Sequence, residues 1–173
     1  IQANPRKAMT MGTISYTYDH QWYVDVADAA SGAPKYVLVT DDEGFNPSND
    51  DASYEPKYKC NKTNPKYVTG RKTNIEMDID IVEGQELQEW LVKHEDDINV
   101  PTSVVRVWRF HDGTSTAKEA AFAMTLSPID GDAEGALKAK GTLSMTSDGW
   151  TEGTFDEKTK AFTAKPATPP AQG

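Results

Sequence analysis

Within the stretch TNIEMDIDIV, residues 73–82, hydrophobic and acidic residues alternate without a break from Ile75 to Ile81. Successive side chains of a β-strand point to opposite faces, so this pattern predicts a strand with one buried face and one face of carboxylates. Carboxylates this close together repel one another, and their clustering therefore asks for an explanation. The apolar positions are Ile75, Met77, Ile79 and Ile81, and the acidic positions are Glu76, Asp78 and Asp80.

Similar alternation predicts that much of the remaining chain is also strand. The turn DAASGAP separates the first two predicted strands and favours a hairpin between them. Strands that precede and follow one helix are typical of a mainly β fold, here a β-sandwich or barrel-forming sheet with one flanking α-helix. The further predicted strands cover residues 14–27, 35–40, 103–111, 121–129 and 136–149.

One amphipathic helix is predicted over residues 84–98. Its apolar residues recur every three or four positions, and two glutamates lie near its N-terminal end, where the helix dipole favours negative charge. His94 falls on the apolar side, so we expect it to pack against the core and not to act in catalysis. The apolar set is Leu87, Trp90, Leu91, His94 and Ile98.

A long segment at residues 41–66 is rich in turn-forming residues and has almost no apolar periodicity. Loops of this length are uncommon in compact domains and are often functional. Phe45, Tyr54 and Tyr58 give this predicted loop side chains with which to contact another surface. The chain then divides into an N-terminal arm at 1–12, one domain over 13–156 that includes the loop and the helix, and a proline-rich C-terminal arm at 157–173.

The charge balance argues against a nucleic-acid binder. The chain carries 27 acidic against 18 basic side chains, a formal net charge of −9. Proteins that grip nucleic acid usually show a basic stripe, because neutralising phosphates supplies much of the affinity, and no such stripe is present. The lone Cys60 cannot form an intramolecular disulfide, and we expect no membrane anchor because no apolar run is long enough to cross a bilayer.

The sequence offers few candidates for catalysis or metal binding. His20, His94 and His111 lack the spacing of metal ligands, and no nucleophile elbow, phosphate-binding loop or dinucleotide-binding motif is present. Asp78 and Asp80 would lie about 7 Å apart on one strand face, a separation that some glycosidases use, but a solvated strand face is the better interpretation. The fragment DGDAE lacks the full spacing of a calcium loop. We expect no enzymatic activity, no cofactor and no metal.

The four tryptophans raise a different class of function, a sugar-binding module. Trp22, Trp90 and Trp108 fall on predicted inward faces or in the middle of elements. Trp150, in SDGWTEG, is the one tryptophan predicted to be exposed. A role in the core or in a subunit contact is therefore favoured over sugar stacking.

The order of the predicted elements is more informative than any single motif. A strand leads into a helix that begins EGQ, and then come a strand with V-x-V-W-R-F, another strand, and the segment DAEGALKAKGTLSMTSDGWTEGTF. This arrangement, over residues 66–156, resembles the major tail proteins, or tail tube proteins, of long non-contractile-tailed bacteriophages.

The resemblance implies a structural virion protein that assembles as hexameric rings, stacked into a tail tube through which DNA passes during ejection. In that family, strands of six subunits join into one barrel around the channel, and a long loop and terminal arms bridge successive rings. Loop 41–66, with Phe45, Tyr54 and Tyr58, would be the inter-ring loop. The implied partners are further copies of the chain, the tape-measure and tail-terminator proteins, and genomic DNA that is not specifically bound. The implied locations are the phage tail and, during assembly, the host cytoplasm.

The resemblance also accounts for the acidic strand face. The inner wall of a DNA channel touches water and DNA, and negative charge there repels phosphates, so that DNA slides without sticking. We therefore expect Glu76, Asp78 and Asp80 to face the lumen. Two alternatives stay open: this face looks outward, or its acids pair with Lys138 and Lys140 of the last long strand.

Two other classes of protein fit the same pattern. One is a component of a related contractile injection or secretion machine, or a tail-terminator ring. The other is a monomeric β-sandwich binding module. Long strands with two distinct faces and a loop that bears aromatic residues favour an assembling protein over a monomer.

Overall fold

The structure is a computed structural model, and it describes residues 14–15, 17–28, 30–60, 63 and 65–166. Within these residues the fold is mainly β with a single α-helix, which confirms the predicted class. A short 3-10 helix, η1 (Thr17–Asp19), precedes the first strand. The other elements are β1 (His20–Asp25), β2 (Tyr36–Leu38), β3 (Asp42–Tyr54), β4 (Tyr67–Asp80), α1 (Glu86–Lys93), β5 (Val100–Arg109), β6 (Ser115–Leu126), β7 (Lys138–Met145), β8 (Thr151–Asp156) and β9 (Ala161–Ala164).

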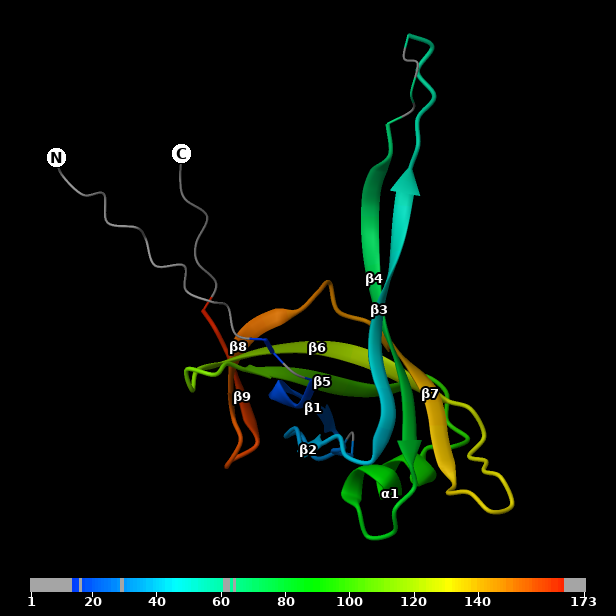
Figure 1. The fold of residues 1–173 in the computed structure, drawn as a ribbon, viewed down its shortest axis with the longest axis vertical. Coiled ribbons are helices and arrows are strands. Elements are labelled where there is room, and N and C mark those ends of the chain that lie inside the picture. The colour runs from blue at the N-terminus through cyan, green and yellow to red at the C-terminus, as the bar shows by residue number, and fades with distance from the viewer. Residues whose placement is uncertain (1–13, 16, 29, 61–62, 64, 167–173) are drawn as a thin grey trace, which may run out of the picture.

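All the strands of the described residues belong to one antiparallel sheet that curls over itself. Its main order is β2-β1-β5-β6-β7-β4-β3, and β8 with β9 branches from β6. Strand β6 changes partner along its length, since residues 122–126 pair with β7 and residues 117–119 pair with β8. In Figure 1, β5 and β6 run across the view, whereas β3, β4 and β7 run along the vertical axis. The two parts of the sheet therefore form two crossing layers.

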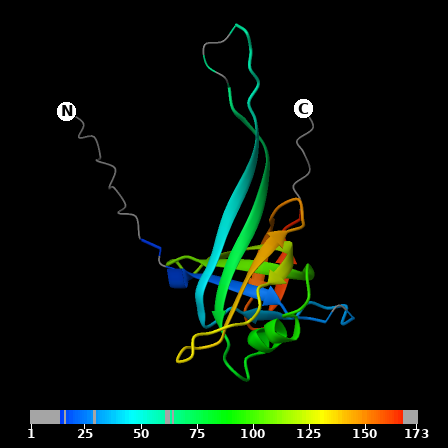
Figure 2. The ribbon, with the colours of Figure 1, turned by 90° about the vertical axis from the view of Figure 1, so that its right-hand side faces the viewer.

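Strands β3 and β4 form a hairpin that is longer than the sheet. They pair from Asp42↔Ile79 to Tyr54↔Tyr67, but β7 pairs with β4 only between Asn74 and Asp80. The remainder, residues 49–54 and 67–73, stands free as a two-stranded ribbon that projects from the body in Figures 1 and 2. At about 3.3 Å per residue, the ribbon extends roughly 20 Å beyond the sheet. We refer to residues 49–54 and 67–73 as the ribbon and to the connecting residues 55–66 as its tip.

The predicted loop at 41–66 is wrong in its first half, because residues 42–54 form β3. The prediction missed this strand because both faces of the ribbon are exposed, so its sequence needs no alternation of apolar and polar residues. Phe45, assigned to the inter-ring loop, is only 6% exposed and lies in the core. The three residues 61, 62 and 64 of the tip lie outside the described part.

The predicted C-terminal arm at 157–173 is also wrong in part. Strand β9 pairs with β8 from Gly153↔Ala164 to Asp156↔Ala161. A Cβ atom at Gly153 would lie 2.3 Å from the carbonyl oxygen of Thr163, so only glycine permits this close approach. The predicted arm at 1–12 and residues 167–173 lie outside the described residues.

The main core fills the space between the two layers of the sheet. Ile75, Met77 and Ile79, the apolar positions of the alternating stretch, are each at most 5% exposed, as predicted. They belong to the same cluster as Val104 of β5 and Phe122 of β6. The rings of Trp22 and Phe45 lie 5.2 Å apart and join the first layer to the hairpin.

Helix α1 covers one end of this core but is shorter than predicted. It buries Leu87, Trp90 and Leu91, whereas Ile98, predicted to be part of its apolar face, is 76% exposed and lies outside it. His94 ends the helix and packs against Trp90, with 5.1 Å between ring centroids, which agrees with the expected packing role. No helix among the described residues is long and apolar enough to span a membrane.

A second, smaller core lies beneath β8 and β9. Within it the hydroxyl of Tyr36 donates a hydrogen bond to the carboxylate of Glu119. Burial, together with this carboxylate, raises the pKa of Tyr36 well above its usual range. The cluster consists of Tyr23, Tyr36, Val105, Val107, Ala117 and Phe155.

Replacing Tyr36 by phenylalanine is expected to lower the free energy of unfolding by about 1.5–3 kcal/mol at neutral pH, because a hydrogen bond to a charged group is lost. Since the folded-state pKa of Tyr36 is raised, this stabilisation is present below about pH 10 and decreases as the pH rises toward the folded-state pKa. Urea unfolding at pH 7 and at about pH 11 measures both effects. The exposed Tyr54→Phe variant is the control, and an equal loss at both pH values would contradict the assignment.

Candidate functional site

The sheet face opposite the main core is polar over four neighbouring strands. Asn46 of β3, Glu76 of β4, Thr142 of β7 and Thr125 of β6 lie side by side in one row. The next row toward the ribbon holds Ser48, Asn74, Ser144 and Ala123, and the next row away from it holds Gly44, Asp78 and Lys140. We call this face, formed by β3, β4, β7 and β6, the polar wall.

The polar wall carries more negative than positive charge. The Nζ atom of Lys140 lies 3.6 Å from the carboxylate of Asp78, and that of Lys138 lies 3.7 Å from the carboxylate of Asp80. The alternative in which these acids pair with lysines is therefore present, at distances longer than a hydrogen bond. Lys138 makes its close contact with Glu43 instead, and this contact holds the pKa of the Glu43 carboxyl below its usual range. Exposed ion pairs of this kind contribute little to stability.

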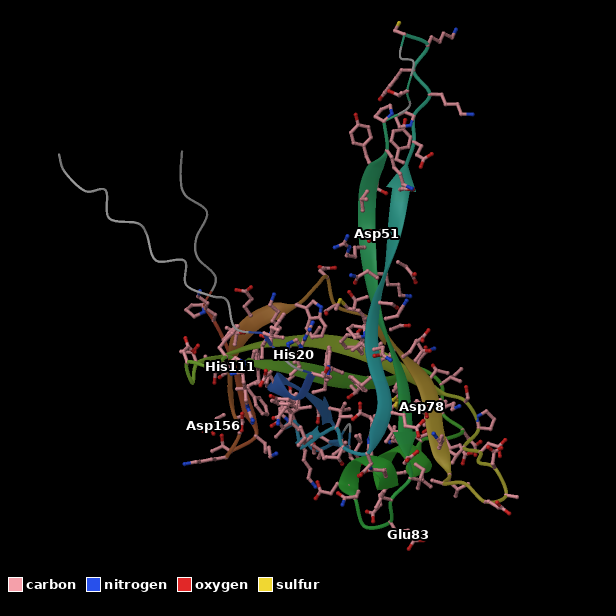
Figure 3. All side chains as sticks on the ribbon, in the orientation of Figure 1. His20, Asp51, Asp78, Glu83, His111 and Asp156 are labelled. Carbon is pink, nitrogen blue, oxygen red and sulfur yellow. The ribbon has the colours of Figure 1, made fainter. Side chains whose placement is uncertain are left out.

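Glu76 is the one acid of the predicted three without a basic neighbour. Its cross-strand partners are Asn46 and Thr142, and it forms no ion pair with any described residue. The structure therefore brings Glu76, Asp78 and Asp80 onto one face, as predicted, and adds Glu43, which sequence reasoning missed because Glu43 lies at an irregularity in β3. Figure 3 shows Asp78 on the part of β4 that lies against β7.

The ribbon is held together by polar pairs and not by a core. The guanidinium of Arg71 donates two hydrogen bonds to Asp51, at 2.7 and 3.0 Å, and these lower the pKa of the Asp51 carboxyl. Thr73 donates to Asn49 at 2.8 Å. An isolated two-stranded hairpin is only marginally stable in water. The ribbon also leaves backbone groups unpaired along both of its edges, and these are ready to pair with another chain.

The end of the ribbon gathers exposed apolar side chains. Tyr54, Tyr58, Tyr67 and Val68 are each between 52% and 58% exposed. Tyr54 and Tyr58 are therefore accessible, as an inter-ring contact requires. Their contact with a neighbouring ring stays a prediction. Phe45 no longer belongs with them, since it is buried at the base of the hairpin.

A second exposed aromatic group lies on β1 and β5. Trp108 is 36% exposed, stacks on Phe110 and contacts His20, with ring centroids 6.4 and 4.1 Å away. Arg106 lies over the rings of both Trp22 and Trp108. The expectation that Trp150 is the exposed tryptophan is wrong, because its ring packs 5.7 Å from Phe122. The even spacing of Arg106, Trp108 and Phe110 could have identified this group.

The described residues contain no cluster of histidine, cysteine and acidic side chains that could hold a metal ion. The three histidines have different neighbours: His20 contacts Arg106, His94 contacts Asp97, and His111 lies 3.6 Å from Asp19. The structure thus offers surfaces for contact with other molecules, and it does not assemble the histidines into one chemical site.

No family model and no curated protein matches the chain. The fold, mainly β with a single helix, nevertheless matches the tail-tube fold. A solved structure of the SPP1 tail tube is 14% identical in sequence, covers 79% of this chain and 77% of that chain, and superposes with a TM-score of 0.56. At this identity the likeness establishes the fold, and it confirms the resemblance seen in the sequence.

Two structures of the anti-feeding prophage also match, but less closely. The baseplate structure is 10% identical and covers 82% of this chain and 97% of that chain, with a TM-score of 0.48. The structure of the tube-terminating cap is 16% identical and covers 85% of this chain and 99% of that chain, with a TM-score of 0.44. The fold assignment therefore rests on the SPP1 tail tube.

Proposed function

We propose that this protein is the structural subunit of a phage tail tube. Subunits assemble as hexameric rings, the rings stack into a tube, and DNA passes through the tube during ejection. The observation that carries the proposal is the likeness of the fold to the SPP1 tail tube over more than three quarters of each chain. The protein then has a structural role and no catalytic one.

The ribbon supports assembly for a physical reason. All of its residues except Thr73 are exposed, and among the described residues no further strand pairs with it beyond Asn74. A long exposed edge of this kind is an aggregation hazard in a monomer, and pairing with neighbouring subunits removes the hazard. Closure of a shared sheet around a channel would place the strands of each subunit beside those of the next.

The polar wall supports the role of a DNA channel. Its four carboxylates, Glu43, Glu76, Asp78 and Asp80, outnumber its two ammonium groups, Lys138 and Lys140. It contains no large apolar side chain, so it is suited to permanent contact with water. In our proposal this face lines the lumen, where its net negative charge keeps DNA from adhering.

The remaining surfaces are assigned to contacts between rings and with other tail proteins. Tyr54 and Tyr58, at the end of the ribbon, contact the neighbouring ring. Tape-measure and tail-terminator proteins are partners inside the tube and at its end. The protein then belongs to the virion tail, after assembly in the host cytoplasm.

Electron microscopy of the purified full chain tests the proposal. At high protein concentration we expect rings with six-fold symmetry and tubes of stacked rings in negatively stained samples. Sedimentation velocity should show the same material moving far faster than the 19.0 kDa monomer. A protein that stays monomeric at every concentration tested would overturn the proposal and would favour a binding module.

The lumen assignment predicts a specific gain of DNA binding. Tubes of the variant Glu76→Lys/Asp78→Asn/Asp80→Asn are expected to retain duplex DNA at least about tenfold better than wild-type tubes at low salt, because phosphates then meet positive charge. Lysine is placed only at position 76, since lysine at 78 or 80 would lie directly opposite Lys140 or Lys138. Co-sedimentation of labelled DNA with tubes measures the retained DNA, and the amount retained should fall as the salt concentration is raised.

A matched control keeps the charge change but moves it away from the polar wall. The variant Asp148→Lys/Glu152→Gln/Glu157→Gln changes the net charge by the same amount at exposed positions outside the polar wall. It should retain no more DNA than wild-type tubes. Equal DNA retention by both variants would show that the total charge matters and that the polar wall has no special role.

A further inference from the structure

The free end of the hairpin is basic. The tip carries four lysines, at positions 57, 59, 62 and 66, against a single acid, Glu55. Lys66 and Glu55 neutralise each other at 3.3 Å, whereas Lys57 and Lys59 have no acidic partner among the described residues. The described part of the tip therefore presents two unpaired ammonium groups next to the exposed tyrosines. A chain with a net charge of −9 concentrates positive charge at this one end.

The opposite end of the molecule is acidic and hollowed. A groove of about 490 Å³ lies between α1 and the residues that precede it, and Glu83 and Glu89 stand on its border. Neither glutamate has a basic partner among the described residues. The apolar part of the lining comes from Ile81, Val82, Gly84 and Val92.

Gln88, in the wall of this groove, has an amide oxygen without a hydrogen-bond partner among the described residues. The residue is 1% exposed and lines the groove. Its amide nitrogen lies 3.4 Å from the carbonyl oxygen of Thr40 and 3.5 Å from the carboxylate of Asp41, but its amide oxygen has no partner among the described residues. Buried polar atoms are rarely left unpaired. This oxygen is covered in the single chain, so a ligand with an N–H or O–H group would pair with it only if the Gln88 amide turned toward the groove. A tyrosine has both an apolar ring and such a hydroxyl.

We propose that the basic tip of one copy docks in the acidic groove beside α1 of a second copy. Lys57 and Lys59 face Glu83 and Glu89, and a tyrosine of the ribbon end enters the apolar part of the groove. The inference rests on the proposed tube function and extends it, because it names the surface that receives the ribbon. Opposite charge at the two ends selects a second copy in head-to-tail orientation over a copy in the reverse orientation.

The geometry of the subunit fits an open stack. Figure 1 shows the tip and α1 at opposite ends of the long axis, and Figure 3 labels Glu83 at the end away from the ribbon. A head-to-tail contact joins two different surfaces at opposite ends of the subunit. When such a contact repeats along the long axis, it does not close into a ring and builds an open stack. Contacts between rings therefore use other residues than the contacts that close each ring.

A charge exchange tests this contact. The tip variant Lys57→Glu/Lys59→Glu and the groove variant Glu83→Lys/Glu89→Lys each place like charges face to face, so each is expected to raise the protein concentration needed for tube formation at least about tenfold. The combined fourfold variant restores opposite charges with reversed signs and should return this concentration to near the wild-type value. Tube length by electron microscopy and polymer mass by sedimentation are measured across a range of salt.

The controls separate this inference from the proposed function. The variant Asp148→Lys/Glu152→Lys makes the same charge change as the groove variant at exposed positions outside the groove, and it should assemble like the wild type. Circular dichroism and thermal melting verify that each variant is folded. Tubes that form equally well from the tip or groove variant, or a fourfold variant that fails to recover, would overturn the docking proposal alone. A wild-type chain that never forms tubes would overturn the proposed function and this inference with it.

Discussion

Replacing Phe122 by alanine is expected to lower the free energy of unfolding by about 3–5 kcal/mol, because the change leaves a cavity where the two layers meet. Phe122 is 1% exposed, lies in the main core, and contacts the ring of Trp150. Natural domains are stable by only about 5–15 kcal/mol in total, so this single change removes a large part of the stability. Urea unfolding followed by tryptophan fluorescence measures the loss.

The matched control is Phe110→Ala, the same chemical change at a position that is 42% exposed. It should cost less than about 1 kcal/mol, because little buried volume is lost. Similar losses for the two variants would mean that the layers do not pack against each other as described.

Removing the ribbon is expected to abolish tube formation and to leave the subunit folded. The variant deletes residues 50–72 and joins Asn49 to Thr73, which are directly paired, through the two-residue turn Asn-Gly. Residues 46–54 and 67–72 are exposed throughout, so the deletion removes almost no core. We expect the melting temperature of the variant to be close to that of the wild type. In sedimentation experiments the variant should form no tubes at any concentration.

This variant has two informative failures. If it unfolds, the ribbon contributes to the stability of the single subunit, contrary to its exposure. If it forms tubes of normal length, the ribbon does not join rings, and the proposed roles of Tyr54 and Tyr58 are wrong. Replacing only those two tyrosines by serine in the full-length chain provides an intermediate case, with shorter tubes expected.

The sequence predicted best those elements in which one face of a strand is buried. The alternation at Ile75, Met77 and Ile79 identified both the buried and the acidic face of β4, because burial of one face imposes a period of two. The same pattern located β1, β5, β6 and β7, although their ends shifted by several residues. The apolar spacing predicted the helix, but the predicted range is too long because the helix ends at His94.

The sequence failed where burial does not control the choice of residues. Strand β3 contains Asp, Asn, Ser and Pro, a composition that predicts a loop, whereas pairing with β4 and not a core fixes its extended conformation. The burial of Phe45 is not predictable in the same way, because one aromatic residue in a polar segment forms no repeating pattern that would indicate a buried face. The pairing of β4 with β7 places Asp78 and Asp80 opposite Lys140 and Lys138, which is one of the alternatives that the sequence left open.

The way in which the hairpin is anchored would have a mechanical consequence in the tube that we propose. The hairpin strands run along the long axis of the molecule (Figure 1), so tension on the ribbon pulls β4 lengthwise past β7. These two strands are joined by a continuous register from Asn74↔Ser144 to Asp80↔Lys138. A lengthwise pull loads all of these hydrogen bonds together, in shear, whereas a sideways pull would break them one after another. A tail built in this way would flex under load without peeling its subunits open.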